Sequence, residues 1–561
     1  IVADFAVRNL GLFIQDTWYV NNNLTLTLGV RADKASVSPA PPHVDGVENI
    51  VWATTGTTGY NNSDVFSGDF LIQPRVGFNY TFDSDRQMQL RGGIGLFQGD
   101  APTVWVGNSY ANAAYHNFVA YTQQLRNACD QWSTAHAGSG ACAGTTLPAL
   151  PFSPDGLNQN RPTVAGSTVY DLSLTSGKSF DLPSVWKANL AFEAETGWMS
   201  TVFSAEALFT KVNNGLYYRA LNLGPGFTGP DGRTLYYNPN VTLFASGTQR
   251  FGRNPAYNNV YLIDNTSKGQ TEQLTFTLSR PFTAESDWSW NLGYTYTHGT
   301  EVGPLTSSTA SSGYTYQYSF DSGENIAKEG RYVIKDRFSG SLNWKHKFFG
   351  DYETRVGLVY EGRSGRPFSY VYSNDANGDT RTANDLFYVP SGRGDVLFGT
   401  IVNGKYVADA AMEASFFDWL SKENNLQAYK GTYAPANDFR AGWVNTFDLR
   451  LTQELPGFFE GHKSQVWVDI QNIGNLLNKD WGHVIDYGFF ADSRVATLVG
   501  IDPVTHKYVY SFRDSSFNSN GSFRTRGSSW GDNASVANGD ADGFDQGISQ
   551  WSVQVGFKYE F

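Results

Sequence analysis

The sequence predicts an all-β fold built of antiparallel strands. Its 561 residues include 58 Gly, 39 Phe, 31 Tyr and 15 Trp, and only 17% are charged, which favours strands and turns over helices. Apolar and polar residues alternate along many segments, as in Leu24-Thr-Leu-Thr-Leu-Gly-Val-Arg31. Short turns alternate with connections of roughly 35 to 85 residues, a spacing typical of transmembrane antiparallel β-barrels. A soluble sandwich has no reason to keep all its long loops at one end.

About thirteen segments show the two-residue alternation of strands with one apolar and one polar face. They cover residues 8–20, 24–33, 71–82, 87–97, 184–196, 199–211, 270–281, 287–299, 335–349, 352–363, 442–455, 463–474 and 548–561. Segment 8–20 is less regular, because Phe13 and Ile14 are adjacent apolar residues and so are Trp18 and Tyr19. We expect a β-bulge or a change of register there.

Charged residues gather on the polar faces of the predicted strands. Arg337, Lys345 and Lys347 alternate with apolar residues, as do Asp448 and Arg450 in a later segment. A basic side chain that meets lipid at the bilayer midplane costs about 2–4 kcal/mol. These faces are therefore expected to line a wet or plugged lumen inside a wide barrel, while the apolar faces meet outer-membrane lipid.

Other classes of protein are disfavoured by the sequence. The chain has 41 Lys and Arg against 53 Asp and Glu, a net charge of −12, so a nucleic-acid partner is not expected. No stretch approaches the 18 or more consecutive apolar residues of a membrane-spanning helix. No H-E-x-x-H, G-x-S-x-G or P-loop sequence appears, so we do not expect an enzyme.

The strand count predicts that the barrel extends beyond this sequence. Single-chain bacterial barrels have even strand numbers, and about thirteen segments is an odd count. The sequence also begins inside a predicted strand and without a methionine. We therefore expect residues 1–561 to be the C-terminal portion of a single outer-membrane β-barrel domain, with extracellular long loops and a periplasmic C-terminus.

The last eleven residues alternate without interruption and end on an aromatic residue. Gln554, Gly556, Tyr559 and Phe561 match the polar-x-Gly-x-x-aromatic-x-aromatic signal by which outer-membrane barrels are recognised for assembly. A free strand edge is a template for pairing with another chain. We expect the barrel assembly machinery to be a partner of this strand.

Several motifs along the chain resemble those of TonB-dependent outer-membrane receptors of the Oar-like branch. They are Asn9-Leu-Gly-Leu-Phe-Ile-Gln-Asp-Thr-Trp18 followed by residues 24–31, Gly365-Arg-Pro-Phe-Ser369, the runs 375–379 and 384–390, and residues 469–482. The resemblance implies a 22-stranded barrel with a plugged lumen, of which this chain would supply the tenth to the last strand. The plug, the TonB box and any N-terminal domain would lie outside this chain, and the TonB–ExbB–ExbD system would act through those missing parts.

One loop segment has the spacing of a hard-cation site. Asp375, Asn377 and Asp379, followed by Asp385, place oxygen ligands at alternate positions, as calcium loops do. The EF-hand pattern requires Gly at the sixth position, where this chain has Thr380. Calcium in an extracellular loop is therefore the one expected cofactor, and an Asx-rich turn is the alternative interpretation.

The longest connection contains both cysteines, Cys129 and Cys142. Exported proteins meet an oxidising compartment, so we expect a disulfide that pins this loop. Aromatic residues of the long loops are further candidates for ligand contact. They are Tyr110, Tyr115, Tyr121, Trp132, Tyr236 and Tyr237.

Three functions remain open from the sequence. The first is a TonB-dependent transporter or receptor that takes up a bulky ligand, such as a peptide, protein or glycan, through its long extracellular loops. The second is a surface adhesion or scaffold barrel, and the third is a passive channel. The extracellular ligand and its binding residues are unknown.

Overall fold

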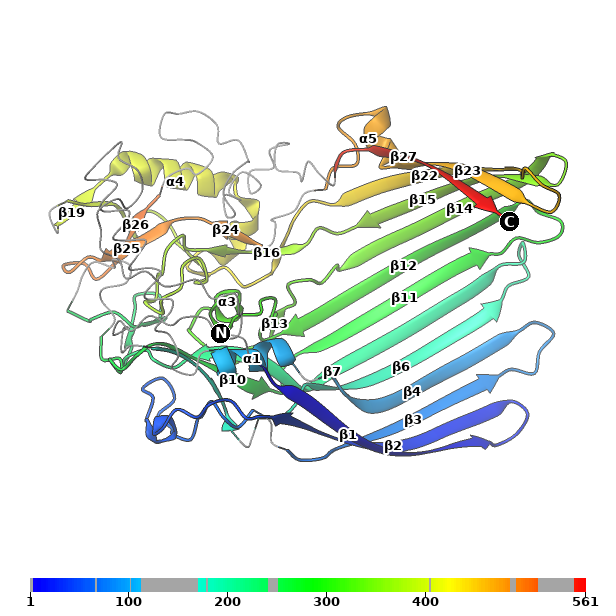
Figure 1. The fold of residues 1–561 in the computed structure, drawn as a ribbon. Coiled ribbons are helices and arrows are strands. Elements are labelled where there is room, and N and C mark those ends of the chain that lie inside the picture. Colours follow the sequence, from blue (N-terminus) through cyan, green and yellow to red (C-terminus); the bar gives the residue numbers. More distant parts are fainter. Residues whose placement is uncertain are drawn as a thin grey trace, which may run out of the picture.

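The computed structural model describes most of the chain. The described residues are 4–65, 68–100, 102–111, 170–177, 180–240, 251–402, 405–484, 491–512 and 549–561. Within them, one large curved sheet carries a compact layer of smaller elements at one end (Figure 1).

The large sheet follows a path of thirteen strands, each hydrogen-bonded to the next in antiparallel orientation. In order they are β1 (Ala6–Tyr19), β2 (Leu24–Ser38), β3 (Leu71–Thr81), β4 (Met88–Gln98), β6 (Ser184–Glu195), β7 (Val202–Ala220), β11 (Gln270–Arg280), β12 (Trp288–Glu301), β14 (Asp336–Phe349), β15 (Tyr352–Arg363), β22 (Val444–Pro456), β23 (Lys463–Gln471) and β27 (Ser552–Glu560). Each predicted segment coincides with one of these strands.

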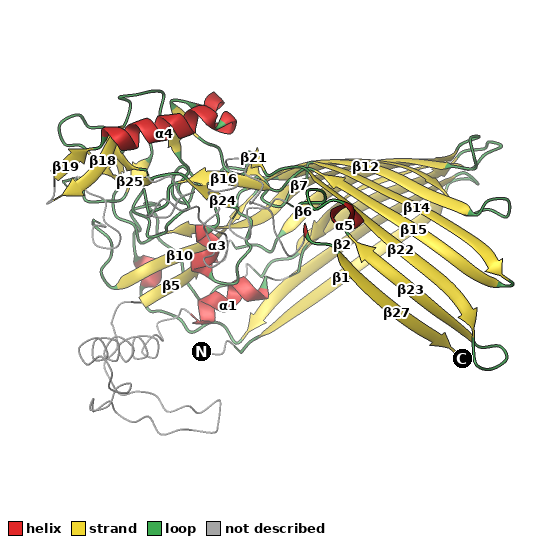
Figure 2. Cartoon of the chain, turned by 90° about the horizontal axis from the view of Figure 1, so that it is seen from above, coloured by secondary structure: helices red, strands yellow, loops and turns green. Residues whose placement is uncertain are grey.

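The sheet is a trough whose two end strands, β1 and β27, come forward on the same side (Figures 1 and 2). Among the described residues, β1 and β27 are the two ends of the path and do not pair with each other. The short turns between β1 and β2, β14 and β15, and β22 and β23 lie at one end of the trough. The long connections leave the sheet at the opposite end, which confirms the predicted asymmetry of the loops.

The bulge expected in segment 8–20 is absent. Strand β1 pairs with β2 in unbroken register from Ala6 opposite Ser38 to Tyr19 opposite Thr25. Phe13 and Ile14 point to opposite faces, and their side chains are 74% and 73% exposed. The irregular pattern therefore arises because β1 has apolar residues on both faces and not because it contains an extra residue.

The elements beyond the long connections form what we call the loop layer. Its strands are β5 (Tyr170–Thr175), β8 (Phe227–Thr228), β9 (Thr234–Leu235), β10 (Tyr257–Thr266), β13 (Lys328–Glu329), β16 (Pro367–Val371), β17 (Tyr388–Val389), β18 (Leu397–Val402), β19 (Lys405–Ala408), β20 (Thr432–Tyr433), β21 (Phe439–Arg440), β24 (Asp492–Arg494), β25 (Thr497–Ile501) and β26 (Tyr508–Ser511). The pairs β5–β10, β16–β24 and β18–β26 are parallel, so the expectation of antiparallel strands holds for the large sheet and not for this layer.

Helices are few and short. They are η1 (Val47–Asn49), α1 (Thr103–Ala111), α3 (Ala310–Thr315), α4 (Ala410–Lys422), η3 (Asn424–Tyr429) and α5 (Ile473–Leu477). The longest, α4, begins where the Asp409 carboxylate accepts a hydrogen bond from the Met412 N–H at 2.9 Å, a normal N-cap. Among the described residues, no helix combines the length and the apolar character needed to cross a membrane.

The main hydrophobic core lies in the loop layer. Its largest buried cluster is rich in aromatic residues, and Phe387, Phe416 and Tyr510 lie at its centre, with ring centroids 5.7–6.5 Å apart. Helix α4 contributes Phe416 and Leu420, which are four residues apart and so lie on one helical face. None of the buried residues of this cluster comes from the thirteen strands of the large sheet.

Candidate functional site

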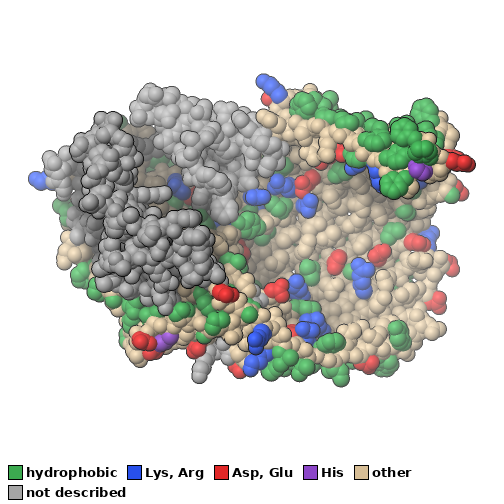
Figure 3. Space-filling view, viewed as in Figure 1, with side chains coloured by type: hydrophobic (Ala, Val, Ile, Leu, Met, Phe, Trp, Pro, Cys, Tyr) green, Lys and Arg blue, Asp and Glu red, His purple; other side chains and the backbone are tan. Residues whose placement is uncertain are grey.

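The concave inner face of the large sheet is polar and charged (Figure 3). Arg337 Nε and Glu361 Oε1 pair at 2.8 Å between β14 and β15. Arg355 Nη2 lies 2.6 Å from Glu353 Oε2 on its own strand and 3.5 Å from Glu454 Oε1 on β22. The alternation thus correctly predicted a charged face, and the structure adds that several of its charges pair within or across the strands.

A second polar network lies near the loop-side end of β2 and β3. Asp33 accepts hydrogen bonds from Arg31 Nε at 2.6 Å and from Gln73 Nε2 at 2.5 Å. The side-chain Oε1 of Gln73 in turn accepts a hydrogen bond from Arg75 Nη2 at 3.1 Å. A Cβ atom at Gly11 on the neighbouring strand would collide with the Arg31 and Asp33 side chains. The glycine therefore leaves room for this network on the inner face.

The predicted assembly signal forms the end strand of the sheet. Gln554 and Gly556 lie on the inner face, opposite Asp469 and Trp467 of β23. The Trp467 ring occupies the space that a side chain at Gly556 would need. Phe561 is 98% exposed. Recognition by the assembly machinery stays a prediction, because nothing in the structure tests it.

Tyr559 is engaged by the turn that precedes β23. Its hydroxyl lies 2.8 Å from His462 Nδ1 and accepts a hydrogen bond from the Phe458 N–H at 3.1 Å. The Phe458 and Tyr559 rings are stacked with centroids 5.5 Å apart. Strand β27 is therefore bound to its neighbour in two ways: its backbone pairs with β23, and the Tyr559 side chain contacts the β22–β23 turn.

The predicted calcium segment lies in the loop layer and is buried. The exposed fractions are 6% for Asp375, 0% for Asn377, 1% for Asp379 and 0% for Asp385. Asp375 Oδ1 accepts a hydrogen bond from the Gly378 N–H at 2.7 Å, and its Oδ2 accepts one from Thr380 at 2.8 Å. Gly378 has a φ of +83°, a conformation that glycine adopts without strain.

The carboxylates of this segment lie close enough to influence one another. Burial, and then the charge of Asp379, raise the pKa of Asp385 well above its usual range. Asp379 Oδ2 accepts hydrogen bonds from Tyr314 at 2.7 Å and from Asn384 at 3.0 Å. Within the described residues, no three acidic, histidine or cysteine side chains are placed to hold a metal ion together. The calcium site stays a prediction.

The sequence analysis missed Arg233, whose side chain is fully buried beside this segment. Arg233 Nε donates to Asp231 Oδ2 at 2.9 Å, and Nη1 lies 3.9 Å from Asp385 Oδ1. The guanidinium also lies over the Tyr372 ring at 5.1 Å. Burial opposes its charge, but the Asp231 carboxylate and its other neighbours raise the pKa of Arg233. Asp-Gly-Arg is an ordinary turn sequence, so nothing in it indicated burial.

The remaining predicted residues divide into two groups. Cys129 and Cys142, together with Tyr115, Tyr121 and Trp132, lie outside the described residues. In contrast, Tyr110, Tyr236 and Tyr237 are buried, with 2–8% of their surface exposed. Because these three tyrosines pack inside the loop layer, they do not offer the ligand-contacting surface that the sequence analysis expected.

Comparison with known proteins decides what kind of sheet this is. Residues 2–480 match the family model described as an outer membrane beta barrel domain. The chain belongs to this family. The outer-membrane barrel therefore places its charged inner face toward a lumen and its convex apolar face toward lipid.

Solved structures to which the chain is similar include one transporter and two receptors. The outer membrane transporter YddB from Escherichia coli is 10% identical, with a TM-score of 0.42 over 87% of this chain and 42% of its own. The siderophore receptor PirA from Acinetobacter baumannii is 11% identical, with a TM-score of 0.38 over 86% and 43%. A variant of the ferric enterobactin receptor PfeA from Pseudomonas aeruginosa is 11% identical, with a TM-score of 0.36 over 83% and 40%.

The chain spans about two fifths of the length of these three structures. No curated protein matches the sequence significantly.

The lipid-facing side of the outer-membrane barrel carries exposed apolar residues in register from strand to strand. Val76 lies opposite Leu28 on one side and Ile94 on the other, and all three are 44–54% exposed. At the short-turn end Trp198 and Phe458 are 58% and 84% exposed. Aromatic residues at this position suit the interface between hydrocarbon and water.

Proposed function

We propose that this chain is the C-terminal part of a TonB-dependent outer-membrane transporter of the Oar-like branch that takes up a bulky ligand. The observation that carries the proposal is the inner face of the sheet. It holds cross-strand pairs such as Arg337–Glu361 and Arg450–Asp469, at 2.8 and 3.5 Å, where a small barrel would have a filled apolar core. Such a wall suits a wide lumen that is filled by water and a polar plug.

The rest of the barrel would complete this wall. In a 22-stranded barrel, the thirteen strands of the large sheet would be the tenth to the twenty-second. The plug and the TonB box would precede them, and the TonB–ExbB–ExbD system would supply energy through those parts. The single barrel domain that we propose for residues 1–561 would then be a portion of one continuous wall.

The loop layer would face the outside of the cell and the short turns the periplasm. This orientation follows the general rule that bacterial barrels have short periplasmic turns and long extracellular loops. It places the C-terminus in the periplasm. The compact core of the loop layer would then serve as a scaffold for capturing a peptide, protein or glycan.

Two alternatives remain: a surface adhesion or scaffold barrel, and a passive channel. Two measurements separate them from the proposal. The first is the intact mass of the denatured protein extracted from outer membranes. A mass far above that of a 561-residue chain supports a continuous barrel with its plug, whereas a mass near that of 561 residues would contradict single-chain transport.

The second measurement is the conductance of the full-length protein in planar bilayers. A plugged transporter is expected to hold the current at its baseline, whereas steady conductance would favour the channel. Binding of a partner through the loops that is unchanged in cells lacking TonB would favour the adhesion barrel.

A further inference from the structure

The connection between β2 and β3 places one histidine against two carboxylates. His43 Nε2 lies 3.6 Å from Glu48 Oε2 and 3.9 Å from Asp45 Oδ1. The His43 and Glu48 side chains are 42% and 39% exposed, and that of Asp45 is fully exposed, so solvent reaches the space between the three groups. An imidazole nitrogen together with carboxylate oxygens is a donor set that divalent transition metals use in proteins.

The backbone on both sides of His43 is fixed by a buried asparagine. Asn62, which is 0% exposed, accepts a hydrogen bond from the N–H of the residue after His43 and donates one to the carbonyl of the residue before it, at 3.1 and 2.5 Å. The chain then turns at Gly46, whose φ is +79°. The buried Val47 anchors the short helix η1, which carries Glu48. The fold itself therefore brings His43 and Glu48 together.

A chain of hydrogen bonds sets the tautomer of His43. Asn61 Oδ1 accepts hydrogen bonds from the backbone N–H groups of Ser63 and Asp64, at 3.0 and 2.7 Å, and from the Ser63 hydroxyl at 3.4 Å. Because the single proton of that hydroxyl is then in use, the Ser63 oxygen accepts a hydrogen bond from His43 Nδ1 at 3.2 Å. Nε2 of the neutral ring consequently presents its lone pair toward Glu48. Metal-binding histidines are oriented by such a partner on the other ring nitrogen.

The oxygen that faces this lone pair has no donor of its own. Glu48 Oε1 accepts a hydrogen bond from Asn49 Nδ2 at 3.4 Å, whereas Oε2 is buried and receives none from the described part of the chain. Two acceptors that face each other repel unless a cation lies between them.

The three groups need only a small movement to share one ion. Ligand atoms bound to tetrahedral zinc at about 2.0–2.1 Å lie about 3.3 Å from one another. As placed in the described chain, the three side chains are too far apart to hold a metal together, but the distances from His43 Nε2, 3.6 and 3.9 Å, exceed that spacing by only a few tenths of an ångström. Rotation of the exposed side chains can close this difference.

We propose that His43, Glu48 and Asp45 bind one divalent transition-metal ion of the zinc and copper class, with water in the remaining position. The nitrogen ligand disfavours Ca²⁺ and Mg²⁺, which take oxygen ligands, so this site differs in kind from the segment around Asp379. Cu²⁺ should bind more tightly than Zn²⁺, as the general order of affinities requires. The site does not depend on whether the barrel transports anything.

The test is titration of the full-length, chelator-treated protein with Cu²⁺ or Zn²⁺, followed by calorimetry and, for copper, by electron paramagnetic resonance. The copper spectrum should show coupling to one imidazole nitrogen. His43→Gln should remove this coupling and lower the number of bound ions by one. Glu48→Gln and Asp45→Asn should each weaken binding. Ser63→Ala, which removes only the partner of Nδ1, should weaken it about 10–100-fold.

His506→Gln is the matched control, since His506 is exposed in the turn between β25 and β26 and should leave the titration unchanged. An unaltered gel band of the folded barrel checks that each variant folds. If the unmodified protein binds neither metal, or if the His43 and His506 variants bind equally, the three groups form only an exposed ion pair and the proposal is wrong. Binding that Asp45→Asn leaves unchanged would overturn the role of Asp45 as a ligand.

Discussion

The indole of Trp467 lies across Gly556, so that the end strand β27 carries no side chain where its neighbour β23 places its largest ring. The same ring receives the Arg450 guanidinium at 5.3 Å, and Arg450 pairs with Asp469 at 3.5 Å. Gly556 therefore has a structural role as well as its predicted role in the assembly signal. It lets an aromatic ring cover a strand position that would otherwise expose backbone.

Gly556→Val should weaken the folded barrel, because its side chain would displace the Trp467 ring. We expect overpacking to lower the free energy of unfolding by about 1–3 kcal/mol. The measurement is the urea concentration at which half of the protein has lost the gel band of the folded, unheated barrel. Gly77→Ala on the same face is the control, since its Cβ would lie 3.7 Å from the nearest atom. The double variant Trp467→Ala with Gly556→Val should recover part of the loss. If the double variant is no more stable than Gly556→Val alone, the clash with the Trp467 ring is not the cause of the lost stability.

Arg233→Met should destabilise the loop layer and leave the large sheet intact. The substitution leaves Asp231 and Asp385 buried without their cation, a change that costs about 3–5 kcal/mol for buried pairs. Faster proteolysis of residues 364–443 with an unchanged barrel band is the expected result. The control Arg393→Met removes a cation at the surface of the same layer, where Arg393 contacts Glu413 at 3.6 Å and the Phe417 ring at 5.1 Å. Equal proteolysis of both variants would contradict the role of Arg233.

Glu423, at the end of α4, should make the stability of this region depend on pH. Burial raises its pKa, against the opposing hydrogen bonds of Tyr370 and Asn425. The folded protein therefore holds the proton more tightly than the unfolded chain, so the stabilisation is complete below the unfolded pKa and is lost as pH rises through the raised one. Hydrogen exchange of residues 410–429, corrected for intrinsic rates, should speed up over this range.

Glu423→Gln should abolish that pH dependence, because glutamine keeps the shape and carries no charge at any pH. Glu413→Gln in the same helix should leave it in place. If the corrected exchange rate of the Glu423 variant still depends on pH as in the unmodified protein, another group is responsible for the pH dependence.

Calcium added to chelator-treated protein should protect residues 375–385 from hydrogen exchange if the segment binds this ion. Half-saturation is expected on the order of 0.1–1 mM, the range of extracellular calcium modules. Asp379→Asn should abolish the protection, whereas Asp45→Asn, whose side chain is fully exposed, should not. Protection that is already complete without calcium would favour the Asx-rich turn.

The strands of the large sheet could be predicted because alternation is a local property. In β11, Leu274 and Phe276 face lipid while Thr275 between them faces inward, and this order can be read without any knowledge of the partner strands. Segment 8–20 shows the limit of the same argument. Its adjacent apolar residues indicated a bulge, whereas the register of β1 with β2 is unbroken.

The loop layer could not be predicted in the same way. Its core joins residues far apart in the chain, as in the contact between the Tyr372 and Tyr510 hydroxyls at 2.6 Å. Arg233 likewise finds its second acidic neighbour, Asp385, far away along the chain. No local pattern reports such contacts, because they depend on how the long connections fold back on one another.

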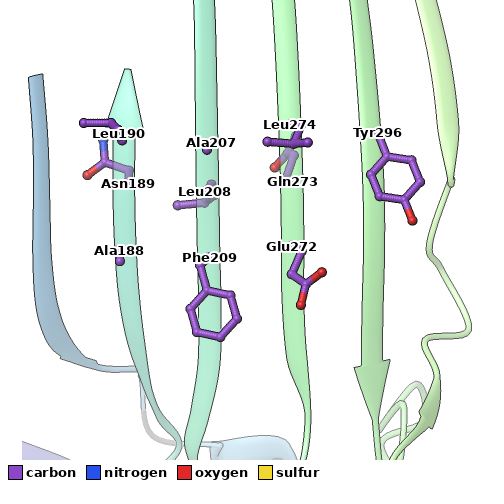
Figure 4. A pocket seen from close by; sticks show the side chains of 10 residues that line it. All are labelled: Ala188, Asn189, Leu190, Ala207, Leu208, Phe209, Glu272, Gln273, Leu274 and Tyr296. Atoms are coloured by element: carbon purple, nitrogen blue, oxygen red, sulfur yellow. The ribbon is translucent and has the colours of Figure 1, made fainter. Parts of the chain in front are cut away.

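The sequence by itself determined the all-β class, the positions of the thirteen strands and the polar character of the inner face, since each follows from the side chains of consecutive residues. Only the tertiary structure decided which charges pair, which loop residues are buried and where the lipid-facing side is hollowed. The physical reason is that pairing, burial and a groove depend on neighbouring strands, and Ala207 becomes the floor of a groove only because Leu190, Phe209 and Leu274 surround it (Figure 4).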